Sequence, residues 1–222
     1  MKKDIVIIKK NFFIYNGEEY DFDRAAEIND LLKSNLKIII LEEELYAKQF
    51  TSNVKRNQIY QFVEYKINNE FLQNGDILYD FEKSNKVTVI YYIKGAKRIE
   101  KLSEKAKNIE VKPLQFIAKD VMEKVLKNKD FTCRILLKFQ EFYYYMSFKN
   151  GLFYNGFVNE DKELVVNKII ENNDFEEIYF DYNIEGDLFF LDKFKMIKMN
   201  LGELINEKIY EKQKFYSRKI LQ

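Results

Sequence analysis

The sequence has no histidine and no tryptophan, and it has one proline, one cysteine and seven glycines among 222 residues. Without histidine, imidazole cannot act as a general base, a metal ligand or a member of a catalytic triad. So few glycines nearly exclude a glycine-rich loop whose backbone could approach a phosphate closely. The single cysteine, Cys133, excludes a disulfide framework within the chain and fits a reducing compartment. We interpret it as a small buried strand residue.

Long apolar runs and an excess of either charge are also missing. No stretch of about 18 apolar residues occurs, so we expect no membrane span within these residues. The short apolar run after Met1 is interrupted by Lys9 and Lys10, so we expect no signal peptide. The 37 basic and 36 acidic side chains nearly cancel, which argues against a nucleic-acid-binding protein. Hydrophobic residues make up 46%, enough for a substantial core.

Two short segments of the chain resemble each other. KKNFFIYNG at residues 9–17 and FKNGLFYNG at residues 148–156 are identical at five positions, including Tyr-Asn-Gly, and the offset is 139 residues. The same offset carries Ala25 onto Leu164, Leu31 onto Ile170 and the strand pattern 37–41 onto 176–180. Because the match keeps its phase over a hairpin, a helix and a strand, it predicts a duplicated unit.

The hydrophobic pattern predicts alternating strands and helices. In the first half we expect strands at 4–8, 12–15, 37–41, 45–50, 76–81, 87–93 and 109–113. Four helices are expected in the same half. The first carries an inward face of Ala25, Ile28, Leu31 and Leu32, and the second, at about 54–72, has an inner stripe of Ile59, Phe62, Val63, Ile67 and Phe71. The other two run through 99–106 and at about 114–126. In the second half we expect strands at 133–138, 142–148, 152–158 and 177–181, and a helix capped by Asn159 with Leu164, Val165, Ile169 and Ile170 inward.

This order of elements resembles the actin-like platform proteins of type IV pilus assembly and type II secretion, the PilM and GspL types. The resemblance rests on the run Ile-Ile-Ile-Leu at 38–41, the long helix ending in Asn-Asn-Glu-Phe at 68–71, and the strands and helix that follow to residue 111. The proline usual in that family after the first of these strands is missing, and three glutamates at 42–44 replace it. We interpret them as a solvated turn or, alternatively, a contact for a basic partner.

The resemblance implies an α/β protein with mixed sheets and a degenerate actin-like (ribonuclease H-like) fold of two lobes. It implies a first lobe at 1–128 with a small inserted subdomain at about 45–93, a second lobe at 129–205, and a basic, aromatic tail at 206–222. A partner's peptide would lie in the groove between the first lobe and the inserted subdomain.

Proteins of the actin-like fold bind nucleotide with two Asp-x-Gly hairpin turns and a Gly-Gly turn. Here the corresponding turns, at residues 9–11 and 138–141, contain no Asp-x-Gly, so we expect no catalytic residue and no bound nucleotide. Lys9 and Lys10 could neutralise a phosphate, but we interpret them as solvated turn lysines. The acidic group Asp181, Glu185 and Asp187 lacks the spacing of a calcium loop, so we expect no metal and no other cofactor.

Two surfaces are candidates for binding a partner. On the helix at 54–72, Tyr65 and Leu72 fall opposite the inner stripe, and they either form a docking patch or lie under the neighbouring lobe. In the tail, Tyr210, Phe215 and Tyr216 alternate with basic residues. Such a tail either lies beside a membrane or packs as a helix on the domain, and nucleic-acid binding is a third reading.

From the resemblance we expect a non-catalytic cytoplasmic scaffold at the cytoplasmic face of the inner membrane. Its partners would be a membrane-anchored assembly protein and the cytoplasmic assembly ATPase, with membrane association through a partner or a following transmembrane helix. A homodimer is a further expectation. Two alternatives stay open: an active actin-like ATP-binding protein, and a structural or regulatory protein unrelated to secretion.

Overall fold

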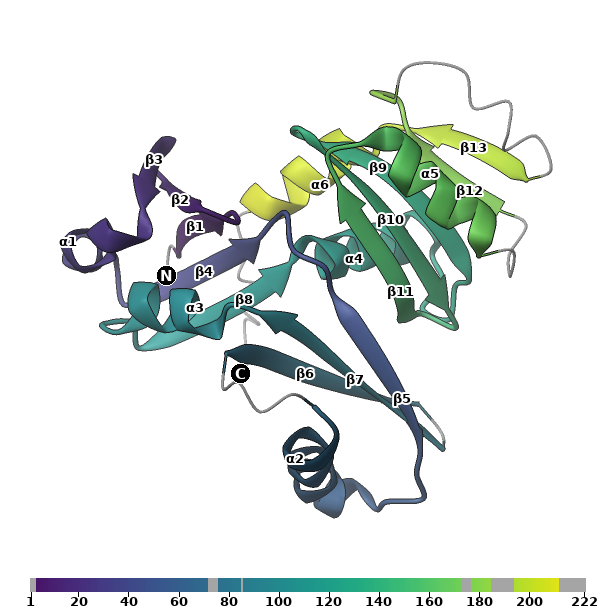
Figure 1. The fold of residues 1–222 in the computed structure, drawn as a ribbon, viewed down its shortest axis with the longest axis horizontal. Helices are drawn as coiled ribbons and strands as arrows, with labels where there is room; N and C mark the ends of the chain where they lie inside the picture. Colours follow the sequence, from purple (N-terminus) through teal and green to yellow (C-terminus); the bar gives the residue numbers. More distant parts are fainter. Residues whose placement is uncertain (1–2, 72–75, 85, 173–176, 185–193, 212–222) are drawn as a thin grey trace, which may run out of the picture.

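Three β-sheets with helices packed on them make up the described part of the protein, seen in a computed structural model (Figure 1). The structure describes residues 3–71, 76–84, 86–172, 177–184 and 194–211. Two of the sheets have five strands and the third has three. No helix in these described ranges is long and apolar enough to cross a lipid bilayer.

The first five-stranded sheet combines an antiparallel hairpin with parallel strands. Its order is β3-β2-β1-β4-β8, in which β1 is antiparallel to β2 and parallel to β4, and β4 is parallel to β8. The strands are β1 (Asp4–Ile8), β2 (Phe12–Tyr15), β3 (Glu18–Asp21), β4 (Asn35–Ile40) and β8 (Asn108–Pro113). The apolar run in β4 is buried on both faces, because Ile39 points to the central core while Ile38 and Ile40 point to the outer one.

The second five-stranded sheet repeats the first. Its order, β11-β10-β9-β12-β13, has the same pattern of antiparallel and parallel neighbours. The strands are β9 (Cys133–Phe139), β10 (Phe142–Lys149), β11 (Leu152–Asn159), β12 (Glu177–Asp181) and β13 (Lys195–Met199). The chain therefore contains one strand arrangement twice. Strands β3 and β13 were absent from the elements expected from the sequence.

The Tyr-Asn-Gly match that suggested the repeat does not align equivalent positions. In the first lobe Asn16 and Gly17 form the turn between β2 and β3, with φ of 52° and 89°. The equivalent turn in the second lobe is Asn150-Gly151, with φ of 50° and 71°. The matched tripeptide at 154–156 lies inside β11 instead. The duplicated architecture is present, but the sequence offset of 139 residues is wrong for the hairpin.

The three-stranded sheet lies between β4 and β8 in the chain. Its antiparallel order is β5-β7-β6, formed by β5 (Tyr46–Thr51), β6 (Ile77–Ser84) and β7 (Val87–Lys94). A 3-10 helix, η2 (Arg56–Gln58), leads into α2 (Ile59–Glu70), which covers one face of this sheet. Ile59, Val63 and Phe71 are buried against Ile90, and Phe62 and Ile67 pack beside them, which confirms the predicted inner stripe.

A central core joins all three sheets. It is built around α4 (Leu114–Leu126) and α6 (Leu201–Tyr210), which contact each other between the two lobes. The core includes Tyr144 and Met146 of β10, a strand that the sequence predicted to be buried on both faces. A short 3-10 helix and three helices cover the outer faces of the lobes: η1 (Phe22–Arg24), α1 (Ala25–Asn29) and α3 (Ala96–Ser103) on the first, and α5 (Lys162–Glu171) on the second.

Three local predictions were wrong. Helix α1 ends at Asn29, so Leu31 falls beyond it and is 65% exposed. Leu164 is 48% exposed, because the inner face of α5 is formed by Val165, Val166 and Ile169. The cap of α5 is Asp161, whose side chain accepts a hydrogen bond of 2.8 Å from the N–H of Glu163.

Candidate partner-binding groove

The turn between β1 and β2, where the actin-like resemblance would place a phosphate, contains Lys9, Lys10 and Asn11. Lys10 is exposed, as predicted, but Lys9 is not a solvated turn lysine. The ammonium of Lys9 lies 3.2 Å from the carboxylate of Glu42, and both side chains are largely buried. The other oxygen of that carboxylate accepts a hydrogen bond of 3.2 Å from the backbone N–H of Lys10. The chain thus supplies its own anion to this turn.

Glu42 also connects the two lobes. It has a positive φ of 63°, an uncommon conformation for a residue other than glycine. Its backbone N–H donates a hydrogen bond of 2.9 Å to the hydroxyl of Tyr144, which is buried in the second lobe. The three glutamates at 42–44 were interpreted as a solvated turn, which is wrong for Glu42 and Glu43. Glu43 pairs with Arg98 at 2.6 Å, and both of these side chains are only 20% exposed.

Arg98 completes this arrangement. Its guanidinium donates to the backbone carbonyls of Lys9 and Lys10 at 3.1 and 3.0 Å, as well as to Glu43. Arg98 therefore holds the backbone carbonyls of Lys9 and Lys10, while Glu42 holds the ammonium of Lys9 and the backbone N–H of Lys10. An incoming phosphate would have to displace Glu42 and meet the negative charge of Glu43 nearby.

The corresponding turn of the second lobe lies between β9 and β10. Gln140 in this turn has a φ of 55°, and Lys138, Gln140, Asn183 and Asn200 line a polar pocket of about 380 Å³. Glu203 and Glu207 on α6 add negative charge to the same pocket. The two carboxylates outnumber the single cation of this pocket, Lys138, so the pocket does not favour an anionic ligand.

Asp181 lies fully buried at the end of β12, beside this pocket. Its carboxylate accepts hydrogen bonds from the N–H groups of Gly202 at 2.8 Å and Asn183 at 3.1 Å. Burial raises the pKa of Asp181, although these N–H groups act in the opposite direction. Because it holds the first turn of α6, Asp181 has a structural role here. Glu185 and Asp187, its companions in the acidic group, lie outside the described residues.

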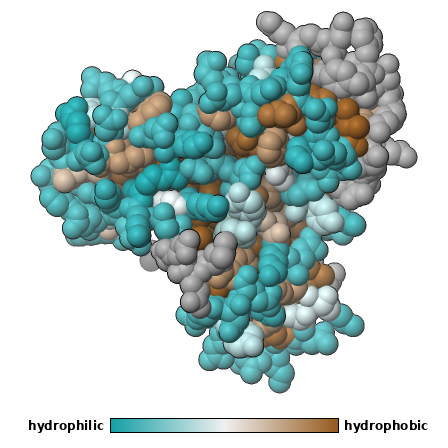
Figure 2. Space-filling model, in the orientation of Figure 1, coloured by the Kyte–Doolittle hydropathy of each residue, from teal (hydrophilic) through white to brown (hydrophobic). Residues whose placement is uncertain are grey.

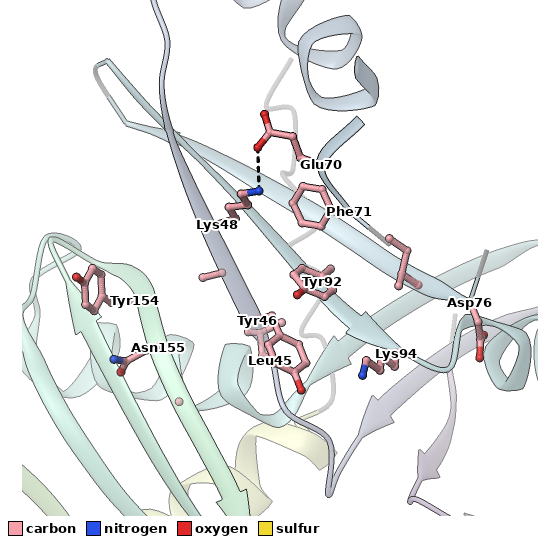
Figure 3. Close-up of a pocket in the computed structure, with 13 residues that line it drawn as sticks. Leu45, Tyr46, Lys48, Glu70, Phe71, Asp76, Tyr92, Lys94, Tyr154 and Asn155 are labelled. Carbon is pink, nitrogen blue, oxygen red and sulfur yellow. Dashed lines mark ion pairs between the residues drawn. The ribbon is translucent and has the colours of Figure 1, made fainter. Parts of the chain in front are cut away.

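A larger groove, of about 710 Å³, opens between the inserted sheet and the second lobe (Figure 3). One wall is Leu45 and residues 46–48 of β5 together with Tyr92 and Lys94 of β7, and the opposite wall is β11 at residues 154–156. The end of α2 and the start of β6 complete it with Glu70, Phe71, Asp76 and Ile77. A smaller pocket of about 170 Å³ lies between the inserted sheet and the first lobe, where the resemblance placed a partner's peptide.

Aromatic rings form the apolar part of the large groove. Tyr46 and Tyr92 stack with ring centroids 4.9 Å apart, and Phe71 meets Tyr92 edge-on at 5.0 Å. Burial and the neighbouring carboxylate of Glu44 raise the pKa of Tyr46, so its hydroxyl stays neutral. Figure 2 shows hydrophobic atoms at the surface near the junction of the three parts, on a face that is otherwise largely hydrophilic.

Charged side chains lie at both ends of these rings. Lys48 and Glu70 form an ion pair of 2.8 Å at one end, and Lys94 and Asp76 lie at the other (Figure 3). The carboxylate of Asp76 caps the start of α3 by accepting the N–H of Lys97 at 2.8 Å. The ammonium of Lys94 lies 5.9 Å from the ring centre of Tyr46. Within the described residues no carboxylate forms an ion pair with Lys94. The groove can therefore accept an apolar group beside a negative one.

The partner-binding residues predicted from the sequence lie apart from one another. Tyr65 is 62% exposed on α2, so the neighbouring lobe does not cover it. Tyr210 is 57% exposed at the end of α6, far from α2 in Figure 1. Leu72, Phe215 and Tyr216 lie outside the described residues. Helix α6 continues to Tyr210, so the start of the segment expected as a tail is helical, with Ile209 buried. The sequence analysis did not predict the aromatic rings of the groove, because Tyr46 and Tyr92 meet only when the sheet forms.

Comparisons with known proteins give matches among solved structures alone. No protein-family model matches the chain, and no curated protein matches it. The cytoplasmic domain of EpsL, an inner-membrane component of the type II secretion system of Vibrio cholerae, aligns with a TM-score of 0.55 and 10% identity over 92% of each chain. The chain has the actin-like fold.

Two further structures share this fold. A Bacteroides thetaiotaomicron protein of unknown function with an actin-like ATPase fold aligns with a TM-score of 0.53 and 11% identity, over 92% of this chain and 95% of that one. The PilM-PilN type IV pilus biogenesis complex aligns with a TM-score of 0.53 and 12% identity, over 82% of this chain and 76% of that one. At these identities the likeness concerns the fold, and it confirms the two-lobed actin-like architecture expected from the sequence.

Proposed function

We propose that this protein is a non-catalytic cytoplasmic scaffold in the inner-membrane platform of a type IV pilus or type II secretion machine. It joins a membrane-anchored assembly protein to the cytoplasmic assembly ATPase and works at the cytoplasmic face of the membrane. The observation that carries this proposal is that the carboxylate of Glu42 occupies the first hairpin turn, where the actin-like resemblance would place a phosphate. The fold itself is shared with the EpsL cytoplasmic domain and with the PilM-PilN complex. Coupling of two partners needs rigid lobes and grooves rather than reactive side chains.

The two partners are assigned to different parts of the molecule in this proposal. The groove between β5 and β11 has the size, rings and charges to take a peptide segment of the membrane-anchored protein. The exposed face of α2 around Tyr65, with Leu72 following it, is a second contact surface in this proposal. Tyr210, Phe215 and Tyr216 are proposed to face the membrane or a protein at its surface. A homodimer is part of the proposal as well.

A pull-down tests this function. The full chain is immobilised and exposed to detergent-solubilised membranes and to the purified assembly ATPase of the source organism. We expect a membrane protein with one spanning helix and the ATPase to be retained. Tyr65→Ala and Tyr210→Ala should each weaken one of the two contacts, whereas Tyr182→Ala, a similarly exposed tyrosine after β12, should weaken neither. If wild-type protein retains neither partner, the proposal fails.

The competing function, ATP binding, has its own measurement. Calorimetry with ATP and Mg²⁺ should show no binding to the wild-type chain, because the carboxylate of Glu42 already engages the ammonium of Lys9 and the backbone N–H of Lys10 in the first turn. Binding with a dissociation constant of about 1 μM, equivalent to about 8 kcal/mol, would contradict a purely scaffolding role.

A further inference from the structure

Strand β5 is the outermost strand of the inserted sheet, and one of its edges lacks a strand partner among the described residues. Residues 46–51 of β5 pair with β7 on the other edge. An unpaired edge presents a row of N–H and C=O groups that can accept another strand. In this molecule the free edge faces the groove of about 710 Å³ rather than open solvent.

The pairing of β5 with β7 identifies which backbone groups are free. The N–H of Ser52 donates to the carbonyl of Lys86 at 2.7 Å, immediately beyond the paired residues Thr51 and Val87. Hydrogen-bonded pairs alternate in an antiparallel ladder, so the even-numbered residues of β5 bond to β7. The backbone groups of Ala47 and Gln49 therefore point away from β7, toward the free edge.

The other wall of the groove is also a sheet edge. β11 is the outermost strand of the second five-stranded sheet, and β5 and β11 lie side by side. The register of β11 shifts between Ser147 and Phe148 of β10, which leaves Tyr154 as an extra, bulged residue. A bulge increases the local twist and turns an edge aside. Tyr154 and Ala47 both line the groove, so the groove opens beside the bulge.

We propose that an extended segment of the membrane-anchored partner adds to the free edge of β5 and becomes a fourth strand of the inserted sheet. This inference rests on the proposed function and specifies how the groove is used. The added strand forms main-chain hydrogen bonds with Ala47 and Gln49 and lies along the free edge of β5. Three residues of β5, together with Leu45 just before the strand, line the groove, so a segment of about five residues, an ordinary strand length, fills it.

The walls determine the side chains that the segment must carry. An apolar or aromatic residue packs against the rings of Tyr46, Phe71 and Tyr92. An acidic residue reaches Lys94, which has no carboxylate ion-pair partner in the described part of the chain, while the pair of Lys48 and Glu70 bounds the other end. The segment is therefore a short extended peptide with an acidic residue close to an apolar one.

A pair of substitutions at Ala47 separates strand addition from simple burial in the groove. Ala47→Pro removes the N–H that points to the free edge and leaves the bonds between β5 and β7 in place. Ala47→Ser keeps that N–H at nearly the same size. Retention of the membrane-anchored partner in the pull-down should fall at least tenfold with Ala47→Pro and stay close to wild type with Ala47→Ser.

Hydrogen exchange of the full chain gives a second measurement that does not depend on a variant. A synthetic peptide of the retained partner's cytoplasmic segment is added, and the amides of Ala47 and Gln49 should become protected. Retention by wild type and both variants, or no new protection at 47 and 49, would overturn strand addition while leaving the proposed function intact. If wild-type protein retains no membrane-anchored partner, both proposals fail.

Discussion

The ammonium of Lys37, on β4 of the first lobe, donates a hydrogen bond of 2.8 Å to the carbonyl of Ile209 in the last turn of α6. A weaker contact of 3.4 Å joins it to the carbonyl of Lys208. A cation at a helix C-terminus meets the negative end of the helix dipole. Burial lowers the pKa of Lys37, which indicates that the ammonium is partly removed from water. One side chain thus fastens the sheet of the first lobe to a helix of the second.

Lys37→Met should destabilise the protein by about 1 kcal/mol or more, because it leaves two carbonyls of α6 without their charged donor. Urea unfolding of the variant and of wild type measures the change in the free energy of unfolding. Lys107→Met serves as the control, since Lys107 is exposed and forms no ion pair in the described part of the chain. An equal midpoint for Lys37→Met and wild type would show that water replaces the ammonium without cost.

The link between Glu42 and Tyr144 predicts a second effect on stability. Tyr144→Phe removes the hydroxyl that accepts the N–H of Glu42, and the free energy of unfolding should fall by about 1–2 kcal/mol. Tyr143→Phe, one residue earlier on the same strand, is the matched control because Tyr143 is only partly buried. Urea unfolding of both variants is the measurement, and equal losses would mean that the Glu42 contact contributes nothing specific.

The interactions of Asp4 predict that the stability of the protein depends on pH. Its carboxylate pairs with the ammonium of Lys33 at 2.7 Å and accepts the N–H of Lys33 at 2.8 Å. Burial alone would raise the pKa of Asp4, but these bonds outweigh it, and the pKa lies below its ordinary value of 3.8. The contribution of this carboxylate is therefore complete above pH 3.8 and is lost as the pH falls through the folded-state pKa.

Asp4→Asn should thus cost about 1–3 kcal/mol at neutral pH and progressively less in acid, as wild type loses the same interactions. Urea unfolding at a series of pH values from neutral downward checks this. Asp30→Asn, which removes an exposed ion pair with Lys105, should change the free energy of unfolding by about 0.5 kcal/mol or less. A difference between wild type and Asp4→Asn that stays constant with pH would contradict the expectation.

The equivalent turns of the two lobes give a matched pair of glycine substitutions. Gly17 and Gly151 both have positive φ, so alanine is strained at either position, at about 1–2 kcal/mol. A Cβ at Gly17 would meet no atom within 4 Å, whereas one at Gly151 would lie 1.9 Å from the carbonyl oxygen of Lys129. Gly151→Ala should therefore destabilise the protein clearly more than Gly17→Ala in thermal unfolding. Equal losses would mean that the chain around Lys129 moves away freely.

The sequence predicted the elements whose signal is local. The β-branched run in β4 and the inner stripe of α2 could be recognised because strand and helix periodicity reach only a few residues along the chain. Burial of β10 on both faces followed from its unbroken apolar run. The duplicated plan was also inferred, although the residues that suggested it, Tyr154 to Gly156, are not equivalent to Tyr15 to Gly17.

The functional features were hidden from the sequence because they depend on distant contacts. Glu42 meets the turn at Lys9 and Lys10 across more than thirty residues, so the charges of Glu42 and Lys9, which looked solvated, neutralise each other. The groove requires β5, β7 and β11 to come together, and no local pattern records that. The exposure of Leu31 and Leu164 likewise depends on where their helices end and what packs on them.

The carboxylate of Glu42 in the first hairpin turn has a consequence for how the two lobes move relative to each other. In an actin-like protein that binds nucleotide, hydrolysis can supply the free energy to shift the lobes. Here an internal side chain holds the turn, and the same residue is tied to Tyr144 across the lobes. If the protein is the scaffold proposed above, its rearrangements are powered by the affinities of its partners and reverse when a partner leaves.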